Sequence, residues 1–291
     1  MHLVVQAVIL GVLTGGVYAL IATGQTLIFG VMRVINLAQG AMVILSAYLS
    51  YDLFTRLGLD PFLSVLVTTP IMFALGVAVQ YVFLRRLRAD EGELSLLVMF
   101  AIAVAIEGVL GVRYQTTFRA INPAYRDDTW TVFGYQFSVV RVAAFALCIG
   151  VLLVLYGVLR RTRLGYAIRA TVQNPTAARL LGVEASRVQA LGFGIGAATA
   201  AVGGAVYGAV YSFNAGSHYD LVARLLAIVV LGGLGSVGGA VVAAMVMGVT
   251  EAVLAAEWSP VWSSFSFFVV LLAVLLLRPR GLFGVATRGA L

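Results

Sequence analysis

Ionisable side chains inside apolar segments are the first candidates for chemistry in this chain. Glu107 lies deep in an apolar run over 95–112, and Glu251 lies near one end of a run over 237–256. A carboxylate at the centre of a bilayer costs about 2.5–3.5 kcal/mol on insertion scales, so each is expected to face protein or water. Three roles are open to them: hydrogen bonding between helices, lining a path through the membrane, and proton coupling. No chain of partnered acidic and histidine residues accompanies either carboxylate, which makes proton coupling the weakest interpretation.

Several kinds of chemistry are excluded by residue types that the chain lacks. All 19 basic residues are arginine, and a P-loop needs a lysine on the nucleotide phosphates, so the chain is not expected to hydrolyse ATP itself. Cys148 is the single cysteine, and His2 and His218 lie far apart, which argues against a disulfide or a metal site. No nucleophile and base stand together as in an enzyme. We therefore expect no catalytic residues, no metal and no cofactor.

A glycine-rich segment is a candidate for a path through the membrane. Five of the nine residues from Leu231 to Gly239 are glycine, so a continuous helix is not expected there. The 14 residues over 221–234 would form roughly 21 Å of helix, which is shorter than a hydrocarbon core of about 30 Å. The segment is therefore predicted to enter the membrane, turn at the glycines and leave again. Its path candidates are Gly232, Gly233, Gly235, Ser236 and Gly238.

A second candidate break lies between the first two apolar runs. Arg33, Asn36 and Gln39 recur every third residue, and they would share one face if the stretch were helical. The three side chains form either a polar connection at the cytoplasmic surface or part of a gate along the path.

The composition determines which elements must position these residues. Of the 291 residues, 62% are hydrophobic and 11% are charged, whereas soluble domains have about 45–50% apolar and about 25% charged residues. The arginines stand at the ends of apolar runs and not on one polar surface, so the net charge of +7 does not indicate nucleic-acid binding. The sequence predicts a single all-α, polytopic membrane domain over 1–291 with about eight transmembrane helices, one of them the glycine-broken re-entrant element.

The expected helices are read from the apolar runs and the polar or Gly/Pro interruptions between them. They cover 3–30, 38–55, 62–84, 95–112, 139–159, 188–212, the broken element across 221–256, and 263–278. In the helix over 188–212, small residues recur every fourth position and line one face, which predicts close packing against a neighbouring helix. They are Gly192, Gly196, Ala200, Gly204 and Gly208.

Arginine placement predicts the orientation, because basic residues concentrate in cytoplasmic connections. Three connections are rich in arginine: around Arg85, Arg86 and Arg88; across the loop 160–187; and in the tail with Arg278, Arg280 and Arg288. This orientation makes the loop 113–141 external, and its many aromatic residues suit either the lipid headgroup level or contact with an external partner. It also puts the N-terminus outside if the first two helices each cross once.

The cytoplasmic loop 160–187 contains local signals for one short helix. Asn174 is a strong N-cap, Pro175 suits the first helical position and Gly182 suits the end, so a helix is expected over 175–181. A two-turn helix is marginal alone in water and must rest on a surface. Its small apolar face of Ala177, Ala178 and Leu181 suits docking into a groove; the alternative is a capped connector.

Together these motifs resemble a known family. The segments over 15–20, 33–40, 169–182, 230–240 and 278–284 are similar to the inner-membrane permeases of branched-chain amino acid ABC importers, of the LivH type. Permeases for urea and short amides look similar, so the cargo stays open between these classes. The resemblance implies a bacterial inner-membrane protein that works with a second permease of the LivM type, two ABC ATP-binding subunits and a periplasmic substrate-binding protein.

The resemblance also implies a role for the short helix. It would be the coupling helix that docks on an ATPase, formed by Asn174, Pro175, Ala177, Ala178, Arg179, Leu181 and Gly182. The EAA-loop sequence motif found in many importers is absent, apart from Ala177-Ala178 and a glycine four residues later. The rival interpretation is a self-sufficient secondary carrier, which would be expected to show intramembrane carboxylates in partnered sets.

Overall fold

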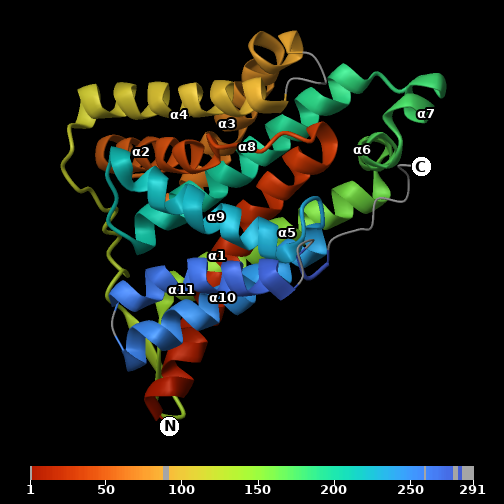
Figure 1. Cartoon of the computed structure of the whole chain (residues 1–291). Coiled ribbons are helices and arrows are strands. Elements are labelled where there is room, and N and C mark those ends of the chain that lie inside the picture. Colours follow the sequence, from red (N-terminus) through yellow and green to blue (C-terminus); the bar gives the residue numbers. More distant parts are fainter. Residues whose placement is uncertain (1, 88–91, 259, 278–280, 284–291) are drawn as a thin grey trace.

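The protein is a bundle of long helices with one small β-hairpin (Figure 1). The computed structural model describes residues 2–87, 92–258, 260–277 and 281–283. Arg88, Arg278, Arg280 and Arg288 lie outside the described residues, as does most of the tail motif over 278–284. The helices are α1 (His2–Met32), α2 (Gln39–Leu57), α3 (Pro61–Val82), α4 (Gly92–Tyr114), α5 (Val139–Arg161), α6 (Arg163–Gln173), α7 (Pro175–Leu180), α8 (Ala185–Val210), α9 (His218–Gly232), α10 (Val237–Glu257) and α11 (Pro260–Leu277), with short 3-10 turns η1 (Leu84–Arg86) and η2 (Ala215–Ser217).

The predicted all-α, polytopic membrane class is confirmed. Among the described residues, seven helical segments are long and apolar enough to cross a membrane. One of them is the 18-residue segment Ala215–Gly232, which joins η2 to α9. This segment starts earlier than the sequence suggested, so its length does not require re-entry into the membrane. The eighth span and the re-entrant path stay predictions.

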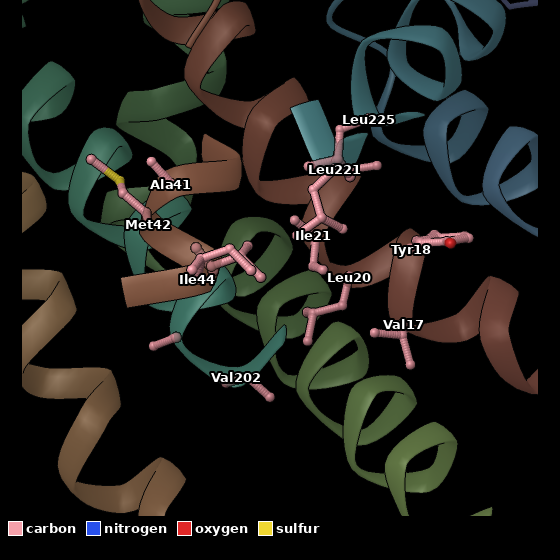
Figure 2. Packing of buried hydrophobic residues seen from close by; sticks show 14 of the residues in the cluster. Val17, Tyr18, Leu20, Ile21, Ala41, Met42, Ile44, Val202, Leu221 and Leu225 are labelled. Carbon is pink, nitrogen blue, oxygen red and sulfur yellow. The ribbon is translucent and has the colours of Figure 1, made fainter. Parts of the chain in front are cut away.

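Helix α8 forms the centre of the bundle, where it packs against α1, α2 and α3. Its small residues allow this close approach: a methyl on Gly204 would lie 2.8 Å from Ser46 Cβ of α2, and one on Gly196 would lie 3.0 Å from the Gly24 carbonyl of α1. A methyl on Gly192 would lie 3.3 Å from the Val31 side chain and one on Gly208 would lie 3.1 Å from the Ile121 side chain, both closer than ordinary contact, and Ala200 is fully buried. Figure 2 shows the apolar side chains of α1, α2, α8 and α9 that fill the space beside α8.

A second close contact, between α1 and α10, was not anticipated from the sequence. A methyl on Gly11 would lie 2.6 Å from Val249 Cα, and a methyl on Gly248 would lie 2.7 Å from Gly15 Cα. Gly11 and Gly15 are four residues apart in α1, as are Ala244 and Gly248 in α10, so each helix has the small-residue spacing that allows close packing. The sequence analysis did not use this signal, which by itself does not say which two helices meet.

The glycine-rich segment forms the turn between α9 and α10. Gly233 and Gly235 have φ of 93° and 84°, in the left-handed region that favours glycine. Ser236 caps α10 by accepting the Gly239 N–H at 3.1 Å. The Leu282 N–H donates to the Leu231 carbonyl at 2.8 Å, so the chain after α11 covers this turn.

The predicted external loop contains a β-hairpin that the sequence analysis did not anticipate. Strand β1 (Thr129–Val132) pairs with β2 (Tyr135–Ser138), with Trp130 opposite Phe137. The hairpin rests on the start of α1, where the Gln6 amide donates to the Gln136 carbonyl at 2.6 Å and accepts the Gln136 N–H at 3.0 Å. We call this side of the bundle the hairpin end.

The loop 160–187 lies at the opposite side, which we call the α7 end (Figure 1). It contains two helices, because α6 precedes the expected short helix. Ile168 of α6 packs with Leu27 and Val31 near the end of α1 and with Val188 of α8. The α6 signal was present in the sequence: Thr162 is an N-cap that accepts the Gly165 N–H at 3.1 Å, and the buried positions Gly165, Ile168 and Thr171 recur every third residue.

Candidate functional site

A charged cluster joins α9 and α10 in the half of the bundle nearer the hairpin end. Arg224 of α9 forms an ion pair with Glu251 of α10, and its Nε lies 2.9 Å from Asp220. The same guanidinium donates to the Tyr18 hydroxyl at 2.9 Å and lies over the Phe267 ring, 5.4 Å from its centroid. The Arg224 and Glu251 side chains keep only 15% and 16% of their surface exposed.

This cluster gives Glu251 charged partners, whereas the sequence analysis found no chain of partnered acidic and histidine residues beside either intramembrane carboxylate. Arg224 is 27 positions away from Glu251 in sequence, on the other side of the glycine-rich segment. Glu107 also has partners on another helix: Tyr219 donates to its carboxylate at 2.8 Å, and His218 Nε2 lies 3.9 Å from it. The absence of partnered carboxylates therefore no longer argues against a secondary carrier.

A pocket of about 430 Å³ opens beside Glu251, between α1, α5 and α10. Its polar lining residues are Gln6, Thr14, Arg141, Tyr211 and Glu251. Its apolar lining consists of leucine and alanine: Leu3, Ala7, Leu10, Ala252, Ala255 and Ala256, together with Gly248. A pocket with mostly apolar walls and a few converging polar groups is typical of small-molecule sites, whose volumes are roughly 300–1,000 Å³.

Arg141 supplies the positive charge of this pocket. Its guanidinium donates to the Thr14 hydroxyl at 3.5 Å and lies over the Tyr211 ring, 5.5 Å from the centroid. Thr14 and Tyr211 also share a hydrogen bond of 3.4 Å. The sequence analysis did not single out these three residues, which come from α5, from α1 and from the residue after α8.

The polar trio between α1 and α2 does not share one face. Residues 33–36 are not helical, and Arg33 has φ of 56° and an exposed side chain. Asn36 and Gln39 are buried instead, where the Asn36 amide donates to Gln39 at 3.0 Å and the Gln39 amide donates to the Gly196 carbonyl at 3.2 Å. The helix break separates the arginine from the two amides, since the chain turns between them.

The structure brings some of the predicted path residues together but not others. The end of α1 meets the glycine turn, because a methyl on Gly30 would lie 4.0 Å from Gly235 Cα. The break after α1 and the turn before α10 thus adjoin at the α7 end. Glu107 and Glu251 belong to two separate polar groups nearer the hairpin end, on α4 and α10.

The short helix α7 has the predicted caps, and Ala177 and Leu181 of the predicted outward face are exposed. Asn174 Oδ1 accepts the N–H groups of Thr176 and Ala177 at 3.1 and 3.0 Å, and Gly182 follows with φ of 85°. The helix ends at Leu180, one residue before the expected end. Ala178 is only 3% exposed, so its predicted place on a docking face is wrong: the helix turns that residue inward. The large exposed apolar side chains are Leu180 and Leu181, at 84% and 83%.

The described residues contain no group of three or more His, Cys, Asp or Glu side chains that could hold a metal ion. The charged groups form ion pairs and hydrogen bonds with one another and with neighbouring side chains. Combined with seven helices long enough to span a membrane, they form polar sites inside a multi-pass membrane protein.

Comparison with known proteins identifies the family. Residues 7–275 match the family model for the permease component of the branched-chain amino acid transport system. The LivH permease of the high-affinity branched-chain amino acid transport system of Escherichia coli K12 is 28% identical, over 94% of this chain and 93% of its own length. BraD of the corresponding system of Pseudomonas aeruginosa is 29% identical, over 96% and 95%.

A probable LivH permease of Methanocaldococcus jannaschii is 25% identical, over 91% of this chain and 88% of its own length. No solved structure matches the chain significantly. The family model covers most of the chain, and relatives of nearly equal length match from end to end. The chain therefore belongs to the family of branched-chain amino acid transport permeases.

Proposed function

We propose that this chain is the membrane-spanning subunit of an ABC importer that moves branched-chain amino acids across the bacterial inner membrane. Family membership and relatives named for branched-chain amino acid transport support this proposal. Since the chain has no lysine for a P-loop, ATP hydrolysis would take place in two partner ATP-binding subunits. A second permease of the LivM type and a periplasmic substrate-binding protein would complete the transporter.

The exposed face of α7 is the observation that carries the energy-coupling part of this proposal. Leu180 and Leu181 expose more than four fifths of their surface beside a helix of six residues. Adjacent exposed leucines at the end of a short, polar segment are typical of a contact surface. A helix this short is marginal in water, so a partner that covers the two leucines would stabilise it.

A chain of packed elements connects α7 to the centre of the protein. Helix α7 contacts α6, and Ile168 of α6 packs on Leu27 and Val31 near the end of α1. The next part of the chain is the break at 33–36, which adjoins the glycine turn through Gly30 and Gly235. Movement of α7 by an ATPase would therefore reach the two places where the helices are interrupted, and we propose alternating access by this route.

The coupling part is tested by changing the exposed face of α7 in the assembled complex. Leu181→Asp is expected to abolish co-purification of the ATP-binding subunits and leucine uptake, because a carboxylate would be buried at the contact. The amount of permease in the membrane is expected to stay unchanged, since the side chain is exposed in the isolated chain. Gln173→Asp adds the same charge at an exposed position just before α7 and serves as the matched control.

The cargo is tested with the binding protein present. Leucine, isoleucine or valine presented by the binding protein should stimulate ATP hydrolysis by the reconstituted complex. Stimulation by urea or a short amide alone would keep the coupling and change the cargo. Transport by the chain without any ATPase would contradict the importer and support the carrier, whereas normal uptake by Leu181→Asp would contradict docking through α7.

A further inference from the structure

The pocket between α1, α5 and α10 has charges of opposite sign on different walls. We infer that it is a holding site for a free zwitterionic amino acid, with Arg141 binding the carboxylate and Glu251 binding the ammonium group. This inference rests on the proposed function, since it names the place where the transported molecule would pause inside the permease.

The positive wall of the pocket is available for an anion. Within the described part of the chain, no carboxylate lies within ion-pair distance of Arg141. It contacts the neutral hydroxyl of Thr14 and the ring face of Tyr211. A guanidinium presents several N–H donors in a planar fork, and this geometry matches a carboxylate with two parallel hydrogen bonds.

The charged side chains around Glu251, on another wall of the pocket, carry more negative than positive charge. Asp220 and Glu251 both pair with Arg224, so the three groups together have one net negative charge. Glu251 is the member of this group that lines the pocket. An ammonium group beside it would balance the charge, while Arg141 would balance the carboxylate of the same molecule. Both charges of an amino acid would then be compensated beside mostly apolar walls, where pairing matters more than in bulk water.

The remaining walls suit an aliphatic side chain. Leu3, Ala7 and Leu10 come from successive turns of α1, and three alanines face them from α10. Small alanine side chains leave room beside Glu251, and the pocket volume of about 430 Å³ falls within the usual range for small ligands. The site would therefore select an amino acid with an apolar side chain over one with a third charge, which would have to be buried without a partner.

The position of the pocket agrees with a substrate that arrives at the hairpin end. Gln6 lines the pocket and is fixed to the backbone of Gln136 in the hairpin by two hydrogen bonds. The hairpin end is also the side predicted to be external from the arginine placement. A molecule released there would meet this pocket before it reached the helix breaks at the α7 end.

Cysteine protection tests the site without relying on transport. Ala252→Cys places a thiol on the pocket wall, and the native Cys148 is buried. In the complete complex in lipid nanodiscs, L-leucine is expected to slow the reaction of this thiol with an uncharged, hydrophilic methanethiosulfonate. Leucinamide, which lacks the carboxylate, and 4-methylpentanoate, which lacks the ammonium group, should not protect at the same concentration. Thr131→Cys, exposed on β1, is the control position that leucine should leave unaffected.

Charge variants separate binding from a structural effect. Arg141→Gln is expected to raise the leucine concentration for half-maximal protection by at least about tenfold, because a charge-assisted hydrogen bond is lost. Arg141→Lys should keep part of the protection, since it keeps the charge. Arg126→Gln removes one positive charge from the external loop outside the pocket and should leave protection unchanged.

Each outcome decides one of the two proposals. Leucine protection that is lost in Arg141→Gln supports the site. An unprotected thiol in a complex whose ATPase responds to the leucine-loaded binding protein overturns the site and keeps the proposed function. Equal protection by leucinamide and leucine overturns the zwitterion assignment. Leucine protection in a complex whose ATPase ignores leucine supports the site and overturns the proposed energy coupling.

Discussion

The guanidinium of Arg224 on α9 lies against the carboxylate of Glu251 on α10, and about 85% of each side chain is covered by protein. These residues are 27 positions apart, on the two helices that the glycine turn connects. The pair therefore fixes α9 relative to α10 at a distance from the turn itself.

Removing Arg224 alone should destabilise the protein more than removing both members of this pair. Arg224→Gln leaves the Glu251 carboxylate covered by protein without a cation, which typically costs about 3–5 kcal/mol, whereas Glu251→Gln leaves Arg224 paired with Asp220 and should cost less. Arg224→Leu combined with Glu251→Leu removes both charges and is expected to cost less than Arg224→Gln. Thermal unfolding of the detergent-solubilised protein measures this, with Asp220→Asn, at a more exposed carboxylate, as a control of small effect. Additive losses in the double variant would contradict a coupled pair.

The central helix should not tolerate added volume on its small-residue face. Gly204→Val would drive a side chain into the backbone of α2, where a methyl alone would lie 3.0 Å from the Ala47 nitrogen. A loss of at least about 1–3 kcal/mol is expected, seen as a lower melting temperature and less monodisperse protein. Gly150→Val on α5 is the matched control, because nothing lies within 4 Å of a methyl there. Equal melting temperatures of the two variants would mean that α8 and α2 are not closely packed at Gly204.

The turn between α9 and α10 is expected to depend on Gly235 more than on Gly238. Gly235 has a φ of 84°, so Gly235→Ala forces an L-residue into the left-handed region at a cost of about 1–2 kcal/mol. Gly238 lies in the first turn of α10 with open space around it, so Gly238→Ala should be neutral or slightly stabilising. Melting temperatures of the two variants provide the comparison. A lower melting temperature for Gly238→Ala than for Gly235→Ala would show that the left-handed backbone at Gly235 does not limit the stability of this turn.

The two faces of α7 should respond differently to substitution. Ala178 is buried against its own chain, so Ala178→Asp should lower the melting temperature of the isolated permease. Leu180→Ala combined with Leu181→Ala should leave that melting temperature nearly unchanged and weaken association with the ATP-binding subunits. The two measurements are made on the same preparations. A clearly lower melting temperature of the isolated permease with both leucine substitutions would show that these leucines pack within this chain.

Asp60 is expected to anchor the loop 113–141, which is predicted to be external, to the start of α3. It accepts the Phe62 N–H at 2.9 Å as an N-cap, and the Tyr125 hydroxyl donates to its second oxygen. Burial and this hydrogen bond raise the pKa of Tyr125, so the phenol stays protonated and remains a donor at neutral pH. Asp60→Ala should cost about 0.5–2 kcal/mol and speed proteolysis of the loop. Asp127→Ala, at an exposed acidic residue of the same loop, is the control.

Local signals in the sequence predicted the local structure of the chain. Asn174, Pro175 and Gly182 located α7 to within one residue, because caps act on backbone groups a few positions away. The glycine-rich segment was correctly expected to interrupt the helix for the same reason. The loop hairpin and α6 were missed, although Thr162 and the spacing of the buried residues in α6 carried a usable signal.

The sequence by itself determined the membrane class, the helical runs and the breaks between them, since length, hydropathy and capping depend on neighbouring residues. Only the tertiary structure decided that Glu251 meets Arg224, that Arg141 shares a pocket with Glu251, and that Leu180 faces outward while Ala178 faces inward. Each of these relations depends on how helices distant in sequence rotate and pack against one another. Side-chain volume and close glycine contacts across several helices set that packing, and no single segment contains the information.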